Sequence, residues 1–468
     1  MNEPILAPNS SWFDNSHGIK RSSITEITIA DTYTPTNASY KSWDASAEKD
    51  GSVTAYVEGT KLTIAGNGYG CVFANSDSRY AFSDSAGKDP FSSATAFNGL
   101  TLLNTSMATN MYGMFRFAVK VTTLDVSEFD TSNVTDMTVM FTANQNIFAA
   151  LTSLDLTNWD VSNVTSFGGM FQYCTNLTTI GDLANWNTGN CTLMQTMFFN
   201  CQKLTSIDAS NWNMSKVTST ASMFGGCYAL TTIGDTANWN LSSCVNMNRM
   251  FDTCRALTSI NTTNWNVSQV TTMMNMFKSC SVLNSINVAN WHTGSCTTMS
   301  GMFANCGLLN SVDTSKWDVS KVTTFEGTFA FCEALTTIGD TTNWNTGSCL
   351  NMGSMFQHCT SLETLDVSNW DVSKVTNFNS MFSSGDHGVP AMQIKKLDVS
   401  KWDTSSATDM SFMFYGCKGL KAIDVSGWDV GKVITFDHMF AHSNLTIGDV
   451  SGWTTPSATN MNAMFHTV

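Results

Sequence analysis

An aromatic residue recurs at a nearly constant interval over about three quarters of this 468-residue chain. We call each such position an anchor; Phe129 is the first of thirteen, and Trp fills the other twelve. Successive Trp anchors lie 25–27 residues apart, with one gap of 32. A fixed interval kept this often is the signature of a solenoid, whose coils pack only against their neighbours. The Trp anchors are Trp159, Trp186, Trp212, Trp239, Trp265, Trp291, Trp317, Trp344, Trp370, Trp402, Trp428 and Trp453.

Apolar residues stand at set distances from each anchor. Met-Phe follows twelve of the thirteen anchors at eleven and twelve residues, and Thr328-Phe329 is the variant. Met or Phe also stands eight residues after twelve of them, and the resulting i, i+3, i+4 spacing is typical of a two-turn helix. Apolar and polar residues alternate before the anchor and predict a short strand. We therefore expect an α/β solenoid of strand–turn–short-helix coils, about fourteen in number because Met114-Phe115 adds one to the series.

The composition fits a core of stacked side chains. The chain has 14 Trp, 27 Met and 29 Phe. Stacked coils place like residues at about the 4.8 Å interstrand spacing, so these side chains would form continuous apolar ladders. Met suits such a core because its flexible thioether fills small irregularities. We predict that Trp159 through Trp453 stack in a single buried column.

An Asp or Asn lies four residues before every anchor, at the end of the expected strand. A short side-chain acceptor there can bind the backbone N–H groups of the following turn. A ladder of carboxylates could instead bind Ca²⁺, although two of the thirteen positions are Asn. We expect backbone capping. The positions are Asp125, Asp155, Asp182, Asp208, Asp235, Asn261, Asn287, Asp313, Asp340, Asp366, Asp398, Asp424 and Asp449.

The 14 cysteines fall into three groups. Nine lie three residues after the Phe of the Met-Phe position, four lie five residues after an anchor in alternate coils, and Cys71 stands apart. No C-x2-C pair that would suit zinc occurs. We expect buried free thiols that act as small apolar groups. In the alternative, thiols of the two larger groups form disulfides, for example Cys174 with Cys191. Such pairing requires an oxidising compartment.

The sequence lacks the motifs of common enzyme classes. We find no HExxH, GxSxG or P-loop, and no GxGxxG that opens a helix. We therefore predict no catalytic, cofactor-binding or metal-ligating residues, no cofactor, and a protein that is not an enzyme. A ladder of Asp could hold a glycosidase-like carboxylate pair, but no single pair stands out. The net charge of −14 argues against nucleic acid as a partner, and the absence of a run of about 20 apolar residues argues against membrane insertion.

Three segments are predicted along the chain. Residues 1–21 would form a polar N-terminal arm for attachment, residues 22–105 a β-rich cap, and residues 106–468 the repeat solenoid. The cap would contain strands at 24–29, 53–57 and 62–65, and it is expected because the first coil otherwise exposes its apolar end. Insertions after Phe141 and Phe382 would emerge on one edge of the array, which in repeat proteins is often a binding edge.

The repeats LDVSNWDVSKVTNFNSMF at 365–382 and LDLTNWDVSNVTSFGGMF at 154–171 resemble those of the BspA-like leucine-rich-repeat surface proteins. The shared pattern is W-D-x-S-x-V-T-x-M-x-x-M-F-x-x-C, and the resemblance covers about residues 106–468. It implies a leucine-rich-repeat-like array and a role in adhesion or binding. The chain shows no recognisable export signal, lipid anchor or wall-sorting motif. In this it also resembles repeat arrays of phage particles, which are made in the host cytoplasm and freed by lysis.

We hypothesise a non-enzymatic structural or binding protein, in the first place a phage virion fibre, tail or head decoration protein located in the virion. Its arm would bind virion or surface proteins, and its solenoid would bind a host-surface protein or glycan; a homo-oligomer is also compatible with the sequence. The alternative is a bacterial cell-surface adhesin of the BspA-like type. A glycan-active enzyme is a third class, which would need a pocket with a close carboxylate pair.

Overall fold

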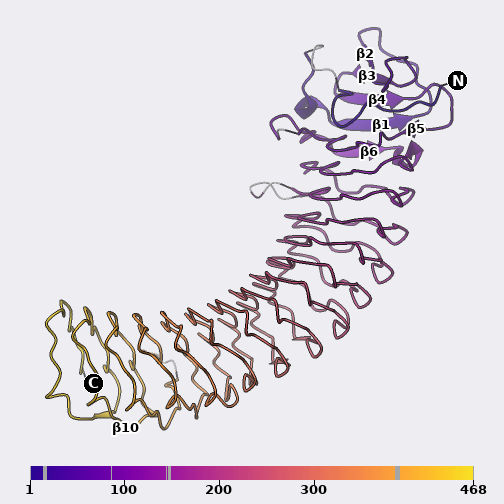
Figure 1. The fold of residues 1–468 in the computed structure, drawn as a ribbon. Coiled ribbons are helices and arrows are strands. Elements are labelled where there is room, and N and C mark those ends of the chain that lie inside the picture. The colour runs from indigo at the N-terminus through magenta and orange to yellow at the C-terminus, as the bar shows by residue number, and fades with distance from the viewer. Residues whose placement is uncertain are drawn as a thin grey trace. The chain divides into compact units, whose positions relative to one another are not determined.

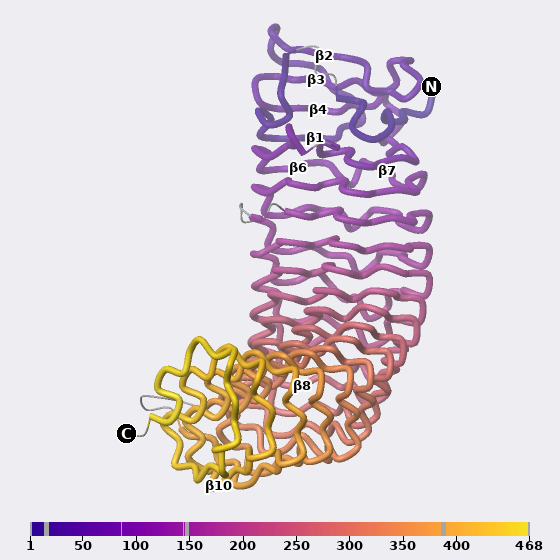
Figure 2. The backbone as a smooth tube through the Cα atoms, turned by 60° about the vertical axis from the view of Figure 1, so that its left-hand side comes forward, coloured from indigo at the N-terminus to yellow at the C-terminus, as the bar shows by residue number. Residues whose placement is uncertain are grey.

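The computed structural model describes residues 2–13, 18–85, 87–143, 145, 149–384 and 390–466. They form two compact units, residues 1–235 and 236–468, which we call the N-terminal and C-terminal units. In each unit the chain winds through stacked coils, and in the N-terminal unit a small sheet precedes them (Figure 1, Figure 2). In the part of the chain that the structure describes, no helix is long and apolar enough to cross a membrane.

A five-stranded sheet forms the cap of the N-terminal unit, with strand order β2-β3-β4-β1-β6. β3 and β4 form an antiparallel hairpin, whereas β1 pairs in parallel with both β4 and β6. The three predicted cap strands are confirmed as β1, β3 and β4; the short β2 and β6 are not evident from the sequence pattern. The bounds are Glu26–Ala30 for β1, Lys41–Asp44 for β2, Thr54–Glu58 for β3, Lys61–Ala65 for β4 and Ala96–Asn98 for β6.

Residues 4–13 are built into this cap and do not form a separate arm. Trp12 and Phe13 are buried, at 1% and 4% exposure. The Trp12 indole N–H donates to the Ala81 carbonyl at 2.8 Å, and the Trp43 indole N–H donates to the Trp12 carbonyl at 2.7 Å. The predicted boundary at residue 21 is therefore corrected, because burial of these aromatic side chains holds the segment against the cap. Residues 14–17, also assigned to the arm, lie outside the described residues.

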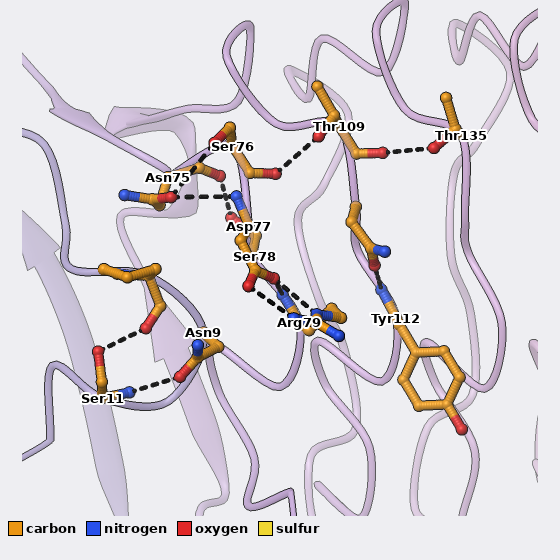
Figure 3. A network of polar contacts seen from close by, with 12 residues as sticks. Asn9, Ser11, Asn75, Ser76, Asp77, Ser78, Arg79, Thr109, Tyr112 and Thr135 are labelled. Carbon is orange, nitrogen blue, oxygen red and sulfur yellow. Dashed lines mark hydrogen bonds and ion pairs between the residues drawn. The ribbon is translucent and has the colours of Figure 1, made fainter.

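Coil stacking begins inside the segment predicted as cap. β5 at Val72–Phe73 pairs in parallel with β7 at Leu103–Asn104. Figure 3 shows polar contacts that join the following coils: the Thr109 hydroxyl donates to the Ser76 carbonyl at 3.1 Å, and the Thr135 hydroxyl donates to the Thr109 carbonyl at 3.0 Å. The array therefore starts before residue 106.

Each coil meets its neighbours along two columns of parallel β contacts. One column lies seven residues after the anchor and consists of single-residue bridges, such as Thr272 to Thr298. The other column precedes the anchor; we call it the strand face and define it as the residues four to eight positions before each anchor. The predicted strands thus form, with one or two residues per coil, except in the coils of Trp370 and Trp402, where the strand face carries no bridge. Those long enough for a label are β8 at Ser259–Ile260, β9 at Ser285–Ile286, β10 at Ala422–Ile423 and β11 at Thr446–Ile447.

The predicted two-turn helix does not form. The only helices in the described residues are two 3-10 helices, η2 at Arg21–Ser23 and η3 at Leu100–Leu102. The Met-Phe segment is instead a run of tight turns with a left-handed backbone at the tenth and, in most coils, the fourteenth residue after the anchor. In the coil of Trp265 these residues are Asn275 and Ser279, with φ of 56° and 59°. Left-handed residues at this spacing prevent a continuous right-handed helix.

Hydrogen bonds within and between coils alternate along these turns. The Met276 N–H donates to the Met273 carbonyl of its own coil at 3.1 Å, whereas the Phe277 N–H donates to the Met302 carbonyl of the next coil at 2.8 Å. The i, i+3, i+4 spacing of the apolar residues therefore reflects successive turns. The fold is a repeat solenoid of short strands and turns, and the helical part of the predicted α/β class is wrong.

The Trp anchors form buried ladders within each unit. Every Trp anchor except Trp453 is at most 4% exposed, and Trp453 in the last coil is half-buried. The rings of Trp239, Trp265 and Trp291 stack with centroid distances of 5.7 and 6.2 Å. The Trp265 indole N–H also donates to the Thr236 carbonyl in the preceding coil at 2.9 Å. The predicted core role of the anchors is confirmed.

A glycine bulge accounts for the intervals of 27 residues between anchors. Each such interval carries a Gly five residues before its closing anchor, with φ between 80° and 85°. At one of them, Gly339, an added Cβ would lie 2.7 Å from Asp313 Oδ1 and from Ser315 Oγ. The next N–H, that of Asp340, donates to Ser315 Oγ at 2.9 Å. The three bulges are at Gly181, Gly234 and Gly339.

Replacing Trp265 with Ala should lower the free energy of unfolding by about 3–5 kcal/mol. The side chain is 2% exposed, so its removal leaves a cavity. The matched change Trp453→Ala removes a half-buried anchor and should lower the free energy of unfolding by less. Urea unfolding followed by circular dichroism measures both values, and equal losses would contradict a graded core role for the anchors.

Replacing Gly339 with Ala should lower the free energy of unfolding by about 1–3 kcal/mol, because a residue with a Cβ is strained at this left-handed φ. Gly307→Ala is the control, since nothing lies within 4 Å of an added Cβ there. Thermal unfolding of the two variants should show a lower midpoint for Gly339→Ala alone. A similar midpoint in both would refute the steric requirement for glycine at the bulge.

Candidate binding cleft

The Asp and Asn column before the anchors caps turns, as predicted. The Asp366 carboxylate accepts hydrogen bonds from the Ser368 N–H at 3.0 Å and from the Ser368 hydroxyl at 2.6 Å. The same hydrogen bond, from the N–H two residues onward to the side-chain oxygen, recurs down the column from Asp125 to Asp449. Asn261 and Asn287 make it as well, because only one side-chain oxygen is needed.

These hydrogen bonds also set the protonation of the column. They lower the pKa of Asp155, Asp208, Asp313, Asp340, Asp366, Asp398, Asp424 and Asp449. A glycosidase general acid needs the opposite, a carboxyl group whose pKa is raised by its surroundings. Within the described ranges, no group of three or more His, Cys, Asp or Glu is placed to hold a metal ion. The column is therefore built for backbone capping.

The cysteines are free thiols, and all except Cys71 are buried. Ladder thiols donate to the backbone of the preceding coil: Cys280 Sγ lies 3.1 Å from the Phe251 carbonyl, and Cys306 Sγ lies 3.0 Å from the Phe277 carbonyl. Each such S–H therefore has an acceptor in the core. Burial raises the pKa of these groups, to about 12 at Cys174, Cys227, Cys332 and Cys417.

The alternative pairing of Cys174 with Cys191 is not present. The Cys174 thiol donates to the Phe141 carbonyl at 3.3 Å, and the Cys191 thiol lies 3.4 Å from the Leu193 carbonyl. The two groups of cysteines thus serve as separate small side chains of the core.

A cleft opens on the strand face of the C-terminal unit. Its volume is about 660 Å³, and three successive coils line it, those of Trp344, Trp370 and Trp402. The buried Thr341 and Leu365 lie at its base, at 1% and 8% exposure. A second cleft of similar volume adjoins it across the coil of Trp402. Most of the strand-face surface of these coils therefore lies in one hollowed region.

The coils that line the cleft carry no strand-face bridges between them. A bridge joins Ser311 to Thr337, and the next bridge on this face in the described residues joins Ala422 to Thr446. Three successive coil intervals between them are unbridged, whereas elsewhere on this face unbridged intervals occur singly. A backbone bond from the Lys395 N–H to the Glu363 carbonyl at 3.3 Å still joins two of these coils.

The Trp370 indole N–H lacks the hydrogen bond that other anchors make. Ten other Trp anchors donate to a carbonyl in the preceding coil, as Trp344 does to Thr314 at 3.4 Å. Trp370 Nε1 is buried and has no partner among the described residues. Its equivalent acceptor would be the Thr341 carbonyl, and Thr341 lines the cleft. The two coils stay in contact around this group, because the Thr341 hydroxyl donates to the Asp366 carbonyl at 2.5 Å and the Trp344 and Trp370 rings stack at 5.5 Å.

The cleft carries charges where the earlier strand face is neutral. Glu363, Lys395 and Lys396 stand at two positions that hold Ser, Thr or Asn in every earlier coil from Thr122 onward. The Lys395 ammonium pairs with Glu363 at 2.9 Å. The remaining lining carboxylates are Asp340, Asp366 and Asp398, so four acidic and two basic side chains give the cleft a charge of −2.

The three lining Asp carboxylates act on one another. Hydrogen bonds from Ser368 lower the pKa of Asp366, and repulsion from Asp340 and Asp398 opposes this effect. A favourable site for positive charge therefore lies along the row.

Sequence reasoning missed this cleft. The sequence feature that could have indicated it is the change from Ser and Thr to the charged residues Glu363 and Lys395. The repeat pattern alone does not explain why these positions are charged. In the insertion after Phe382, residues 385–389 lie outside the described residues, and so do residues 144 and 146–148 of the insertion after Phe141.

The chain matches the family described as "Mycoplasma protein of unknown function, DUF285" in five segments that together span residues 88–468. The match covers more than half of the chain, and the chain belongs to this family. The segments are 88–153, 142–262, 230–338, 309–388 and 387–468. No curated protein matches the chain.

Similar solved structures include three bacterial proteins with low identity. A leucine-rich repeat protein from Eubacterium ventriosum is 15% identical, with 77% of this chain and 99% of that chain covered and a TM-score of 0.37. One from Bacteroides ovatus is 16% identical, with 64% and 84% covered and a TM-score of 0.23. The functional domain of InlJ from Listeria monocytogenes, which includes a cysteine ladder, is 14% identical, with 71% of each chain covered and a TM-score of 0.22. The solenoid itself is established by the bridges and hydrogen bonds of this chain.

The native protein should take up at most one equivalent of iodoacetamide at pH 8, at Cys71, and fourteen after unfolding in urea. Burial and raised pKa values keep the other thiols neutral and inaccessible. The folded pKa near 12 exceeds the ordinary value of 9.0, so the stability that the neutral thiols contribute is complete below about pH 9 and is lost as the pH rises toward 12. Peptide mass spectrometry counts the labels, and several native Cys–Cys links would contradict the free-thiol core.

Proposed function

We propose that the protein is a non-enzymatic binding protein that contacts another macromolecule through the strand face of its C-terminal unit. The observation that carries this proposal is the cleft at the interrupted β contacts, where the lining changes from neutral to charged. The lowered pKa values of the exposed Asp column also support a binding role over acid catalysis. The partner would be a protein or glycan of a host or particle surface.

The setting that we propose is a phage virion, in which the protein serves as a fibre, tail or head decoration protein. The many buried free thiols support it, because free thiols persist in a reducing cytoplasm. In this setting the folded cap, and not a free arm, would bind the other virion proteins.

A bacterial cell-surface adhesin is the second candidate, favoured by the resemblance of the repeats to BspA-like surface proteins. In that setting the same cleft would contact a host or neighbouring cell. The two settings share the binding function and differ in where the protein is found.

Quantitative mass spectrometry of density-purified phage particles and of washed cell envelopes from the producing culture tests the setting. We expect the chain in the particles at a fixed ratio to the major capsid protein, and immunogold labelling on the particles. Detection on cell envelopes alone would overturn the virion setting and support the adhesin. Labelled full-length protein should bind to target cells saturably, and non-saturable binding would overturn the binding function.

A further inference from the structure

We propose that a separate pocket of the C-terminal unit, between the coils of Trp265 and Trp291, binds a short neutral glycan. We call it the anchor pocket. Its volume is about 500 Å³, and it shares no lining residue with the cleft described above. The inference therefore adds a second binding surface to the protein. It follows from three features of the pocket: walls of amide and imidazole groups, a lining without charge, and a backbone that is already hydrogen-bonded.

The walls of the anchor pocket come from the residues on either side of two successive anchors. Asn264 and Asn266 flank Trp265, and Asn290 and His292 flank the next anchor. These four side chains are exposed and line the pocket, whereas the Trp265 side chain is buried beneath them. A ligand therefore meets polar groups of two coils above a closed core.

The lining side chains are oriented by the protein and keep hydrogen-bonding groups for a ligand. The Asn266 side-chain oxygen accepts from the Ser268 N–H at 3.1 Å, and the Thr263 hydroxyl donates to the Asn261 side-chain oxygen at 2.8 Å. An amide that accepts through its oxygen can still donate through its nitrogen, and a hydroxyl that donates can still accept. Donors and acceptors placed side by side in this way suit sugar hydroxyl groups, because each sugar hydroxyl both donates and accepts.

The absence of charge in the lining selects a neutral ligand. The residues that line the anchor pocket include no Asp, Glu, Lys or Arg. The equivalent positions of the next coil hold Lys316 and Asp318, and neither lines the pocket. The Lys316 ammonium instead donates to the Asn290 side-chain oxygen at 3.2 Å and so orients that amide. A charged ligand would lose hydration here without gaining an ionic partner in the lining, which costs free energy.

An extended peptide fits the anchor pocket less well than a glycan. Peptides that extend a sheet bind to free backbone groups at a strand edge. Here the Trp265 N–H already donates to the Thr262 carbonyl at 3.1 Å, and the Ser268 N–H is taken by Asn266. The contacts must therefore come from side chains of the two walls, which a compact polyhydroxylated ring can reach together. Peptide binding is the alternative that the experiment must separate.

The experiment is isothermal titration calorimetry of the full-length protein with four neutral trisaccharides: maltotriose, cellotriose, mannotriose and chitotriose. We expect saturable binding of at least one of them, with one site per chain. The acidic trigalacturonate and the basic, fully deacetylated chitotriose should bind at least about tenfold more weakly than the best neutral sugar, which corresponds to about 1.4 kcal/mol. The acetylated and amidated peptide (Thr-Ser)₂ is the neutral peptide control and should also bind more weakly.

Matched variants locate the site. Asn266→Asp places a negative charge in the wall and removes an amide donor, so it should weaken binding of the best sugar about tenfold or more. It should fold normally, because Asp318 and Asp371 make the same turn bond at 3.0 Å in the native chain. His292→Ala removes an exposed side chain from the other wall and should weaken binding as well. Asn345→Asp changes the same column position as Asn266→Asp outside the pocket and should leave binding unchanged. Circular dichroism confirms the fold of the three variants.

Four outcomes would overturn this inference. They are no saturable binding of any neutral trisaccharide, equal binding of a charged trisaccharide, tighter binding of the peptide, and unchanged sugar binding by both Asn266→Asp and His292→Ala. Saturable binding of labelled protein to target cells tests the proposed function separately. Because the anchor pocket and the cleft share no residue, each result can fail while the other stands.

Discussion

The structure depends on the contact of each coil with a nearly identical coil on either side. A single coil has no core of its own, because its Trp and Phe rings stack on rings of the neighbouring coils, as Trp265 does on Trp239 and Trp291. The Phe277 N–H donates to the next coil at 2.8 Å, and the Trp265 indole donates to the preceding coil at 2.9 Å. Backbone and side chains therefore impose the same repeat, and the two longer intervals carry their extra residues after Phe141 and Phe382, between the contacts that repeat.

Small polar side chains hold the shape of each coil between these contacts. Asp366 caps the turn before its anchor, and Asp371 caps the turn after it, each by binding the N–H two residues onward. Ladder thiols such as Cys280 place an S–H against a carbonyl of the preceding coil. These carboxylates and thiols bond backbone N–H and carbonyl groups that the hydrogen bonds between coils do not use. The buried polar groups of the turns therefore remain hydrogen-bonded.

The cleft arises where this regularity is relaxed. After the left-handed Gly339, the strand face carries no bridge as far as the coil of Trp428, and the Trp370 indole N–H has no acceptor among the described residues. At the same coils the neutral surface gives way to Glu363, Lys395 and Lys396. The surface of a repeat protein can thus change over a few coils while the buried ladders continue beneath it.

The amino-acid sequence by itself determined the period, the buried anchors, the capping Asp column, the free thiols and three cap strands, because each of these follows from spacing or from the chemistry of one side chain. Only the tertiary structure decided the conformation of the Met-Phe segment and the fate of residues 4–13. An i, i+3, i+4 spacing fits a helix and a run of turns equally well, and the choice was made by N–H groups such as that of Phe277, which bond to the next coil. The segment 4–13 looks polar and irregular in sequence, yet Trp12 finds its place only against Ala81, a residue far along the chain. The cleft likewise depends on which side chains of three stacked coils come together, and that juxtaposition exists only once the coils are stacked.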